Sequence, residues 1–256
     1  MKSKAGKLTG FALVLFVLAA FGCSTTPPRE DLWIGEFYYF AKMFDEAITA
    51  CTNEIKVNPN SWESYTIRGL AYTEQGEYDK AITDFTEAIA LYGPTSPVLR
   101  IRRTVMPPYR GRGYAYYQKG DYTAAIEDFN RAVQVWLHDS ASYNYRGIAY
   151  FRQKDYDQAI VSFSEALRVD PKFSIVYSNR GDTYYNKADY DRAIADYTDA
   201  IGLDPQLVVA YNNRGMAYYN KADYDLAIAD LTEAIRLNPD YTGAKENLEF
   251  VQRRGQ

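Results

Sequence analysis

The chain has one histidine, two cysteines and four methionines among 256 residues, so few of its side chains can bind metals or act as nucleophiles. A single histidine excludes any site that needs two imidazole groups from one chain. His138 has no Ser or Cys motif beside it, and Gly111-Arg112-Gly113 lacks the third glycine and the preceding strand of a phosphate loop. We therefore expect no catalytic residue, no bound metal and no cofactor.

An excess of positive charge is also missing. The 29 basic and 33 acidic residues give a net charge of -4, and an acidic chain is a poor binder of nucleic acid. The apolar share of 47% and the charged share of 24% are ordinary for a globular protein, which excludes a disordered chain and a membrane protein with several spans. Tyrosine is abundant, with 25 residues against 3 tryptophans.

The amino terminus has the pattern of a secretion signal. Three lysines precede an apolar run from residue 11 to residue 21, which is shorter than the roughly 20 residues of a spanning helix. Its end, Ala20-Phe21-Gly22-Cys23, resembles a bacterial lipobox. The resemblance implies a lipoprotein signal peptide at 1–22, a lipid on Cys23, a short tether at 23–27, and a location on a membrane, facing the periplasm or the cell exterior. The alternative is an ordinary signal peptide cleaved nearby, which would leave a soluble protein with a free thiol.

Internal repeats are the strongest signal in the chain. Gly147, Gly181 and Gly215 lie 34 residues apart within copies of one phrase, Arg-Gly-x-x-Tyr-Tyr-x-Lys-x-Asp-Tyr-x-x-Ala-Ile. The same spacing separates Gly35 from Gly69 and Gly113 from Gly147, whereas Gly69 and Gly113 are 44 apart. We number the repeats as units 1 to 6, at residues 28–61, 62–95, 106–139, 140–173, 174–207 and 208–241, with an insertion at 96–105.

This period and its fixed residues resemble the tetratricopeptide repeat (TPR). Counted within each unit, position 8 is Gly, position 11 is Tyr and position 20 is Ala in all six units, and position 32 is Pro in four. The resemblance implies an all-α, right-handed superhelical solenoid in which each unit is a helix-turn-helix. Residues 242–256 begin one more first helix without a second, and they are expected to cap the stack.

The fixed positions predict how each unit packs. Gly at position 8 indicates a close crossing of the two helices, which Ala at position 20 is expected to meet, with the rings at positions 11, 17 and 24 as core around it. Arg at position 7 recurs in five units, and four of these have Asp at position 23, so we expect repeated Arg–Asp pairs. The acids that begin the second helices are expected to cap them: Asp121, Asp155, Asp189 and Asp223.

The resemblance also implies a binding surface. In TPR proteins a concave groove is lined chiefly by positions 2, 5, 9, 12 and 13 of the first helices. Asn suits the main chain of an extended peptide, and Tyr gives a large contact area with a polar tip. The alternative is an ordinary solvated helix face. The groove residues that we expect from units 3 to 6 include Arg110, Tyr114, Tyr117, Asn144, Phe151, Arg152, Asp182, Tyr185, Asn186, Asn212, Met216, Tyr219 and Asn220.

The insertion is the one place where the array departs from its period. Ser96-Pro97 and Pro107-Pro108 are typical helix start and stop signals, so a short extra helix is expected between them. Arg100, Arg102 and Arg103 lie within it, close in sequence to Arg110 and Arg112. They predict either a loop whose arginines pair with nearby acids or a basic patch that meets lipid headgroups, an anionic polymer or an acidic partner.

Two functions remain compatible with the sequence. The first is a lipid-anchored, non-catalytic scaffold of the bacterial cell envelope whose groove holds an extended peptide or a partner helix. The second is a structural subunit of an envelope complex, assembled through the convex face or the helix edges. In both cases the expected partner is a protein or peptide at the envelope, not a nucleic acid.

Overall fold

The structure, a computed structural model, describes residues 30–92, 108–136 and 138–254. The predicted signal peptide, Cys23 with its tether, and the insertion with Arg100, Arg102 and Arg103 lie outside the described residues. The described part is all-α, with thirteen helices and no strand. The helices are α2 (Glu30–Phe40), α3 (Phe44–Val57), α4 (Trp62–Glu74), α5 (Tyr78–Tyr92), α6 (Pro108–Gln118), α7 (Tyr122–Val135), α8 (Ser140–Arg152), α9 (Tyr156–Val169), α10 (Ser174–Asn186), α11 (Tyr190–Leu203), α12 (Val208–Asn220), α13 (Tyr224–Leu237) and α14 (Thr242–Arg254).

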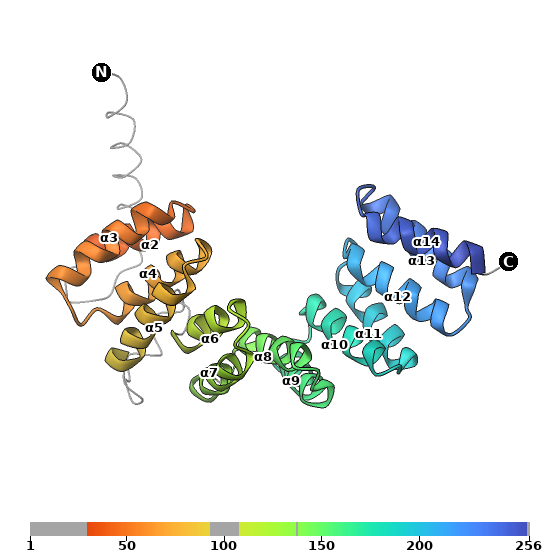
Figure 1. The fold of residues 1–256 in the computed structure, drawn as a ribbon, viewed down its shortest axis with the longest axis horizontal. Coiled ribbons are helices and arrows are strands. Elements are labelled where there is room, and N and C mark those ends of the chain that lie inside the picture. Colours follow the sequence, from red (N-terminus) through yellow and green to blue (C-terminus); the bar gives the residue numbers. More distant parts are fainter. Residues whose placement is uncertain (1–29, 93–107, 137, 255–256) are drawn as a thin grey trace, which may run out of the picture.

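The helices form a superhelical stack of pairs. Each unit holds a first helix and a second helix that pack on each other, and each second helix also packs on the first helix of the next unit. First helices contact one another between neighbouring units, whereas second helices of the described chain do not. The first helices therefore form an inner layer and the second helices an outer one, and Figure 1 shows the stack as an open arch.

Each second helix ends two residues before the proline of position 32 where that proline is present. Val57, Val169, Leu203 and Leu237 are the last helical residues, because proline has no N–H to continue the hydrogen-bond pattern and disfavours helix in the residue before it. Three of the predicted caps are confirmed, since Asp121, Asp155 and Asp189 accept the N–H groups of Ala124, Gln158 and Arg192. The fourth is wrong, because Asp223 makes no such bond.

The turn within each unit uses the left-handed backbone region at position 15. Gly76 and Gly120 adopt it with φ of 77° and 83°. Lys42, Lys154, Ala188 and Ala222 adopt it too, with φ between 58° and 64°, a conformation that is strained for residues with a Cβ. In every unit the N–H of position 16 then donates to the carbonyl of position 11, as in the bond from Asp189 N–H to the carbonyl of Tyr184.

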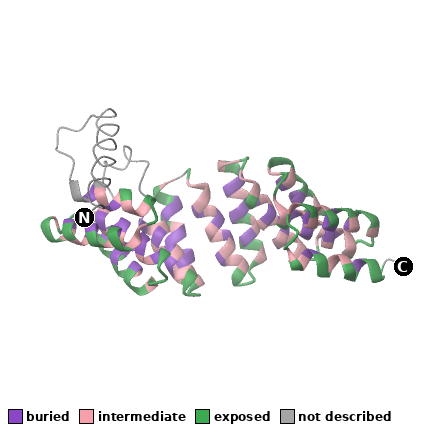
Figure 2. Cartoon of the chain, turned by 90° about the horizontal axis from the view of Figure 1, so that it is seen from above, coloured by how far each residue is buried: buried purple, intermediate pink, exposed green. Residues whose placement is uncertain are grey.

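Buried residues recur along the whole stack, shown in purple in Figure 2, and they form a series of clusters between neighbouring helices. Alanine at position 20 is fully buried in every unit, as expected. The side chain of position 24 also meets the glycine of position 8: a Cβ on Gly147 would lie 2.6 Å from the ring of Phe163, whereas a Cβ on Gly113 would lie 3.2 Å from the carbonyl of the position 20 alanine as well. The tyrosines at position 11 are only partly buried, and those of units 2 to 6 pack against the edge of the core, so the prediction that all these rings are core holds in part.

The last helix, α14, closes the end of the stack. It packs on α13 and α12 and buries Ala244 and Val251. Its polar face and the basic Arg253 and Arg254 in its last turn stay exposed, as expected for a cap. No helix of the described chain is long and apolar enough to cross a membrane.

Candidate functional site

The predicted arginine–aspartate pairs are present in all four units that carry both residues. Arg112, for example, donates from Nε and Nη2 to the two oxygens of Asp128, at 2.7 and 2.8 Å. The carboxylates are buried, and burial raises the pKa of Asp84, Asp128 and Asp196 while the arginine opposite each one lowers it. The remaining pair, Arg214 and Asp230, has the same geometry.

Each of these arginines also joins its unit to the one before. The free Nη1 donates to position 25 of the preceding unit: Arg68 to Thr52, Arg112 to Thr86, Arg146 to Asn130, Arg180 to Ser164 and Arg214 to Thr198. Each guanidinium also lies over the tyrosine of position 4, at 5.1 to 5.9 Å from the ring centre. The position 7 arginines are therefore structural, which agrees with their interpretation from sequence.

Unit 4 is the exception among the five units that have arginine at position 7. Ser162 stands where the others have aspartate, and Arg146 donates from Nε to its hydroxyl at 3.0 Å. Burial lowers the pKa of Arg146, in contrast to the raised values of Arg68, Arg112, Arg180 and Arg214. Among these five arginines, Arg146 is thus the one that forms no ion pair with a carboxylate of the described chain.

A second ladder follows the edge where the turns lie. Position 14 of each unit bonds to position 18 of the unit before: Gln75 to Asp45, Lys119 to Asp79, Gln153 to Thr123, Lys187 to Asp157 and Lys221 to Asp191. The link from Lys119 to Asp79 spans the insertion, so units 2 and 3 stack like the others. This ladder was not predicted from the sequence, although the paired residue types at these two positions carry its signal.

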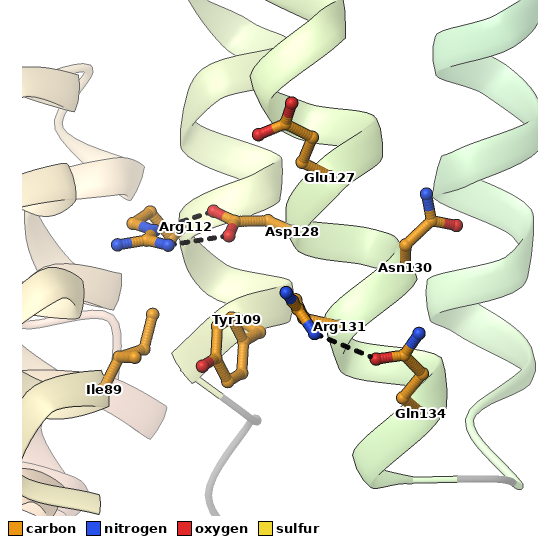
Figure 3. A pocket seen from close by; sticks show the side chains of 8 residues that line it. All are labelled: Ile89, Tyr109, Arg112, Glu127, Asp128, Asn130, Arg131 and Gln134. Carbon is orange, nitrogen blue, oxygen red and sulfur yellow. Dashed lines mark hydrogen bonds and ion pairs between the residues drawn. The ribbon is translucent and has the colours of Figure 1, made fainter. Parts of the chain in front are cut away.

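The outer side carries an open pocket of about 660 Å³ between α5 and the α6–α7 pair. Figure 3 shows Ile89 on one wall, Tyr109 and Arg112 from α6, and Arg131 with Gln134 from α7. Arg112 is held by Asp128, and Arg131 donates to Gln134 at 3.4 Å. Of the charged residues that line this pocket, Arg112 and Asp128 therefore neutralise each other.

The inner layer brings the predicted groove residues onto one face, but not all of them are free for a ligand. Asn144 and Asn212 are 7% and 6% exposed. Their Oδ1 atoms accept the amides of Asn179 and Asn247 from the next first helix, at 3.0 and 2.9 Å. These two asparagines therefore hold neighbouring units together, which differs from the expectation that they are offered to a peptide.

Arg110 is also used within the protein. It forms an ion pair with Asp139, and the same carboxylate caps α8 through the N–H and hydroxyl of Ser142. With Arg112 held by Asp128, neither of the two described arginines near the insertion contributes to the predicted basic patch. The rest of that patch lies outside the described residues.

A row of aromatic pairs joins the inner layer to the outer one. Position 12 of the first helix meets position 17 of the second, with ring centres 5.5 to 5.9 Å apart, in Tyr117–Tyr122, Phe151–Tyr156, Tyr185–Tyr190 and Tyr219–Tyr224. Beside them lie exposed polar side chains at position 13. Arg152 donates to the hydroxyl of Tyr117 at 3.3 Å and Asn220 to that of Tyr185 at 2.9 Å, while Asn186 bonds only its own helix.

The remaining groove residues differ in burial. Tyr114 is partly buried and stacks near Tyr117 and Tyr145, and Met216 is partly buried against Leu231 and Val251. Asp182 is a partly buried carboxylate that accepts the hydroxyl of Tyr197 and the amide of Asn213. Among the described residues, no group of three His, Cys, Asp or Glu side chains could hold a metal ion.

Comparison with solved structures supports the fold. The C-terminal part of a TPR repeat-containing protein from Cytophaga hutchinsonii gives a TM-score of 0.69 at 19% identity, over 87% of this chain and 85% of that one. A chain of the APC/C hetero-tetramer Cut9–Hcn1 gives 0.67 at 22% identity, over 86% of this chain but only 42% of its own length. YrrB, described as a TPR protein with an unusual peptide-binding site, gives 0.60 at 20% identity, over 77% and 96%.

Sequence comparison agrees with these likenesses. No curated protein matches the chain. The family described as "Tetratricopeptide repeat" matches residues 62–93, 140–173 and 208–241, and a second one, described as "TPR repeat", matches 113–154 and 181–222. Together they cover more than half of the sequence, and the matched segments hold the recurring Gly, Tyr and Ala of positions 8, 11 and 20 in units 2 to 6. The chain belongs to the tetratricopeptide repeat family.

Proposed function

We propose that this protein is a non-catalytic interaction scaffold that binds an extended peptide or a partner helix along its inner face. The observation that carries the proposal is the row of aromatic pairs on units 3 to 6, flanked by the exposed Arg152, Asn186 and Asn220. Rings of this kind provide contact area at a small entropic cost, and flanking polar groups can fix the main chain of a peptide. YrrB, whose fold is similar, has a peptide-binding site.

The experiment that tests this function is photocrosslinking in cells from two positions of one unit. Asn186 is exposed on the inner helix α10, and Asp199 is exposed on the outer helix α11. A photoreactive residue at 186 is expected to capture a protein that the same residue at 199 does not. Capture from 199 alone would contradict binding on the inner face.

A second candidate is a structural subunit that assembles through its outer layer. It is favoured by apolar side chains that the second helices leave exposed, among them Val57 at 81% and Val161 and Leu226 at 51% each. The same crosslinking pair separates the two functions, because assembly through the outer layer predicts capture from 199.

We also propose that the protein is anchored to a membrane of the bacterial envelope by a lipid on Cys23. The support is the sequence before the first helix: three lysines, a short apolar run and Ala20-Phe21-Gly22-Cys23. The start of α2 lies only seven positions after Cys23, a reach of at most about 25 Å, so partners at the membrane surface are favoured. The test is metabolic labelling with a palmitate analogue, which should be incorporated by the wild type and not by Cys23→Ser. Equal labelling of both would contradict the anchor.

A further inference from the structure

Unit 5 departs from the packing pattern at two positions that touch. Position 24 is Phe85, Phe129 and Phe163 in units 2 to 4 and Leu231 in unit 6, but in unit 5 it is Tyr197. Position 9 is Leu70, Tyr114, Ile148 and Met216 in the same units, but in unit 5 it is Asp182. The hydroxyl of Tyr197 donates to Oδ1 of Asp182 at 2.7 Å. The ring is 1% exposed, so the carboxylate supplies the partner that its buried hydroxyl needs.

The junction with unit 6 departs from the pattern in the same place. Asn179 and Asn247 each donate to the asparagine at position 5 of the unit before, but position 5 of unit 5 is Ser178. The equivalent Asn213 donates instead to Oδ1 of Asp182, at 2.8 Å. Both bonds thus reach one oxygen. Oδ2 accepts no hydrogen bond from the described residues, and it is not sealed from solvent.

No lysine or arginine of units 5 and 6 forms an ion pair with this carboxylate. All six lysines and arginines of units 5 and 6 pair with other acids: Arg180 with Asp196, Lys187 with Asp157, Arg192 with Asp189, Arg214 with Asp230, Lys221 with Asp191 and Arg236 with Glu233. Burial raises the pKa of Asp182, and only the bonds from Tyr197 and Asn213 oppose it. A neutral amide could accept both bonds without the cost of a partly buried charge.

The surroundings of Asp182 favour one kind of side chain as its partner. Tyr185 lies three residues along the same helix, on the same face, and forms an aromatic pair with Tyr190. A ring beside a carboxylate suits a side chain with a long aliphatic stem and a positive end, because the stem packs on the ring while the end reaches the oxygen.

We propose that Asp182 is the anchoring site for one lysine or arginine side chain of the extended peptide that lies along the inner face. The inference rests on the proposed function and adds the chemistry of the partner. The acidic balance of the whole chain, -4, agrees with a basic ligand. The peptide's positive end would bind at Oδ2, and its stem would lie against Tyr185.

A random library of twelve-residue peptides displayed on phage tests this assignment. It is selected in parallel against the protein, against Asp182→Asn and against Asp199→Asn. The amide of Asp182→Asn still accepts from Tyr197 and Asn213 but carries no charge, and Asp199→Asn removes the same charge from the exposed outer helix of the same unit. Peptides selected by the wild type and by Asp199→Asn are expected to share a lysine or arginine at one fixed position, and those selected by Asp182→Asn to lack it.

The strongest selected peptide then provides an affinity test whose first step uses only the wild-type protein. Replacing its basic residue by glutamine should weaken binding to the wild type by about 10- to 100-fold, as expected for loss of a charge-assisted hydrogen bond. The same replacement should change binding to Asp182→Asn by less than about threefold. A basic residue that Asp182→Asn also selects, or selected peptides without one, would overturn the inference while leaving the proposed function standing. If the wild type selects no peptide at all, both fail.

Discussion

Arg180 holds both carboxylate oxygens of Asp196, donating from Nε at 2.8 Å and from Nη2 at 2.7 Å, while its Nη1 reaches Ser164 of the preceding unit at 3.1 Å. One guanidinium thus joins the two helices of its own unit and the second helix of the unit before. Because the side chain of Asp196 is only 6% exposed, loss of the arginine would leave a buried carboxylate without its cation.

Arg180→Met is therefore expected to lower the free energy of unfolding by about 2–4 kcal/mol. Urea denaturation followed by circular dichroism measures the change. The matched control is Arg236→Met, which breaks an exposed pair within one helix and should leave the unfolding midpoint where it is. Equal effects of the two substitutions would show that the arginine of position 7 is not a structural link.

Ser162→Asp is expected to stabilise the protein, because it restores the carboxylate that the other arginines of this position possess. Arg146 already lies in place, held by Asn130 at 2.9 Å and by Ser162 at 3.0 Å. The gain should be about 1 kcal/mol in the free energy of unfolding. Ser162→Asn, which has nearly the same shape and no charge, serves as the control, and an equal gain there would exclude the ion pair as the cause.

Ala188→Gly and Ala222→Gly should each stabilise the protein by about 0.5–1 kcal/mol, because the left-handed backbone costs alanine more than glycine. Gly76 and Gly120 occupy the same position in units 2 and 3. The control is Ala229→Gly, an exposed alanine within helix α13, where glycine should destabilise by about 1 kcal/mol. Thermal unfolding of the three variants shows which substitutions raise the stability and which lower it.

Asp182→Asn is expected to be more stable than the wild type at neutral pH, with a difference that shrinks as the pH falls. Burial raises the pKa of Asp182 in the folded state above its ordinary value. A raised pKa means that the folded state favours the protonated acid, so this group's contribution is largest at low pH and is lost as the pH rises through the folded pKa. Unfolding free energies measured from pH 7.5 down to pH 4.5 test the trend, and a gap that widens on acidification would contradict it.

The thiol of Cys51 should be unreactive until the protein unfolds. Cys51 is fully buried, and burial raises its pKa to about 12, so neither access nor thiolate is available at pH 8. In the Cys23→Ser variant, modification by an aromatic disulfide reagent should be negligible in buffer and complete in denaturant. Fast labelling of the folded variant would show that the crossing of α2 and α3 is open.

The contacts that sequence could predict are those within a unit. Arg112 and Asp128 belong to one helix pair whose geometry the 34-residue period already implies, so their meeting follows from their positions. The bond from Asn179 to Asn144 joins two units, and it depends on the angle between them, which the period does not determine. Groove residues could thus be assigned to one face, but not divided into those that hold neighbours together and those left for a ligand.

For Asp182, too, the sequence predicted the position of the residue but not its contacts. Its place in the predicted groove followed from its position in unit 5, and the structure does bring it to the inner layer. What the sequence could not show is that Tyr197 and Asn213 converge on one of its oxygens, since these three residues lie on three different helices. The signal that the sequence did offer is that Asp182 and Tyr197, both unusual at their positions, occur in the same repeat.

The ladder between positions 14 and 18 has a mechanical consequence. Every described tie between units, including the one from Lys119 to Asp79, joins nearest neighbours only. Tension applied to the two ends would therefore load the junctions in series, as in a coiled spring, and the extension would be the sum of small rotations at each of them. A partner that binds across several units would limit the rotation at the junctions between them. Tension on the amino terminus would in turn change the curvature of the inner face.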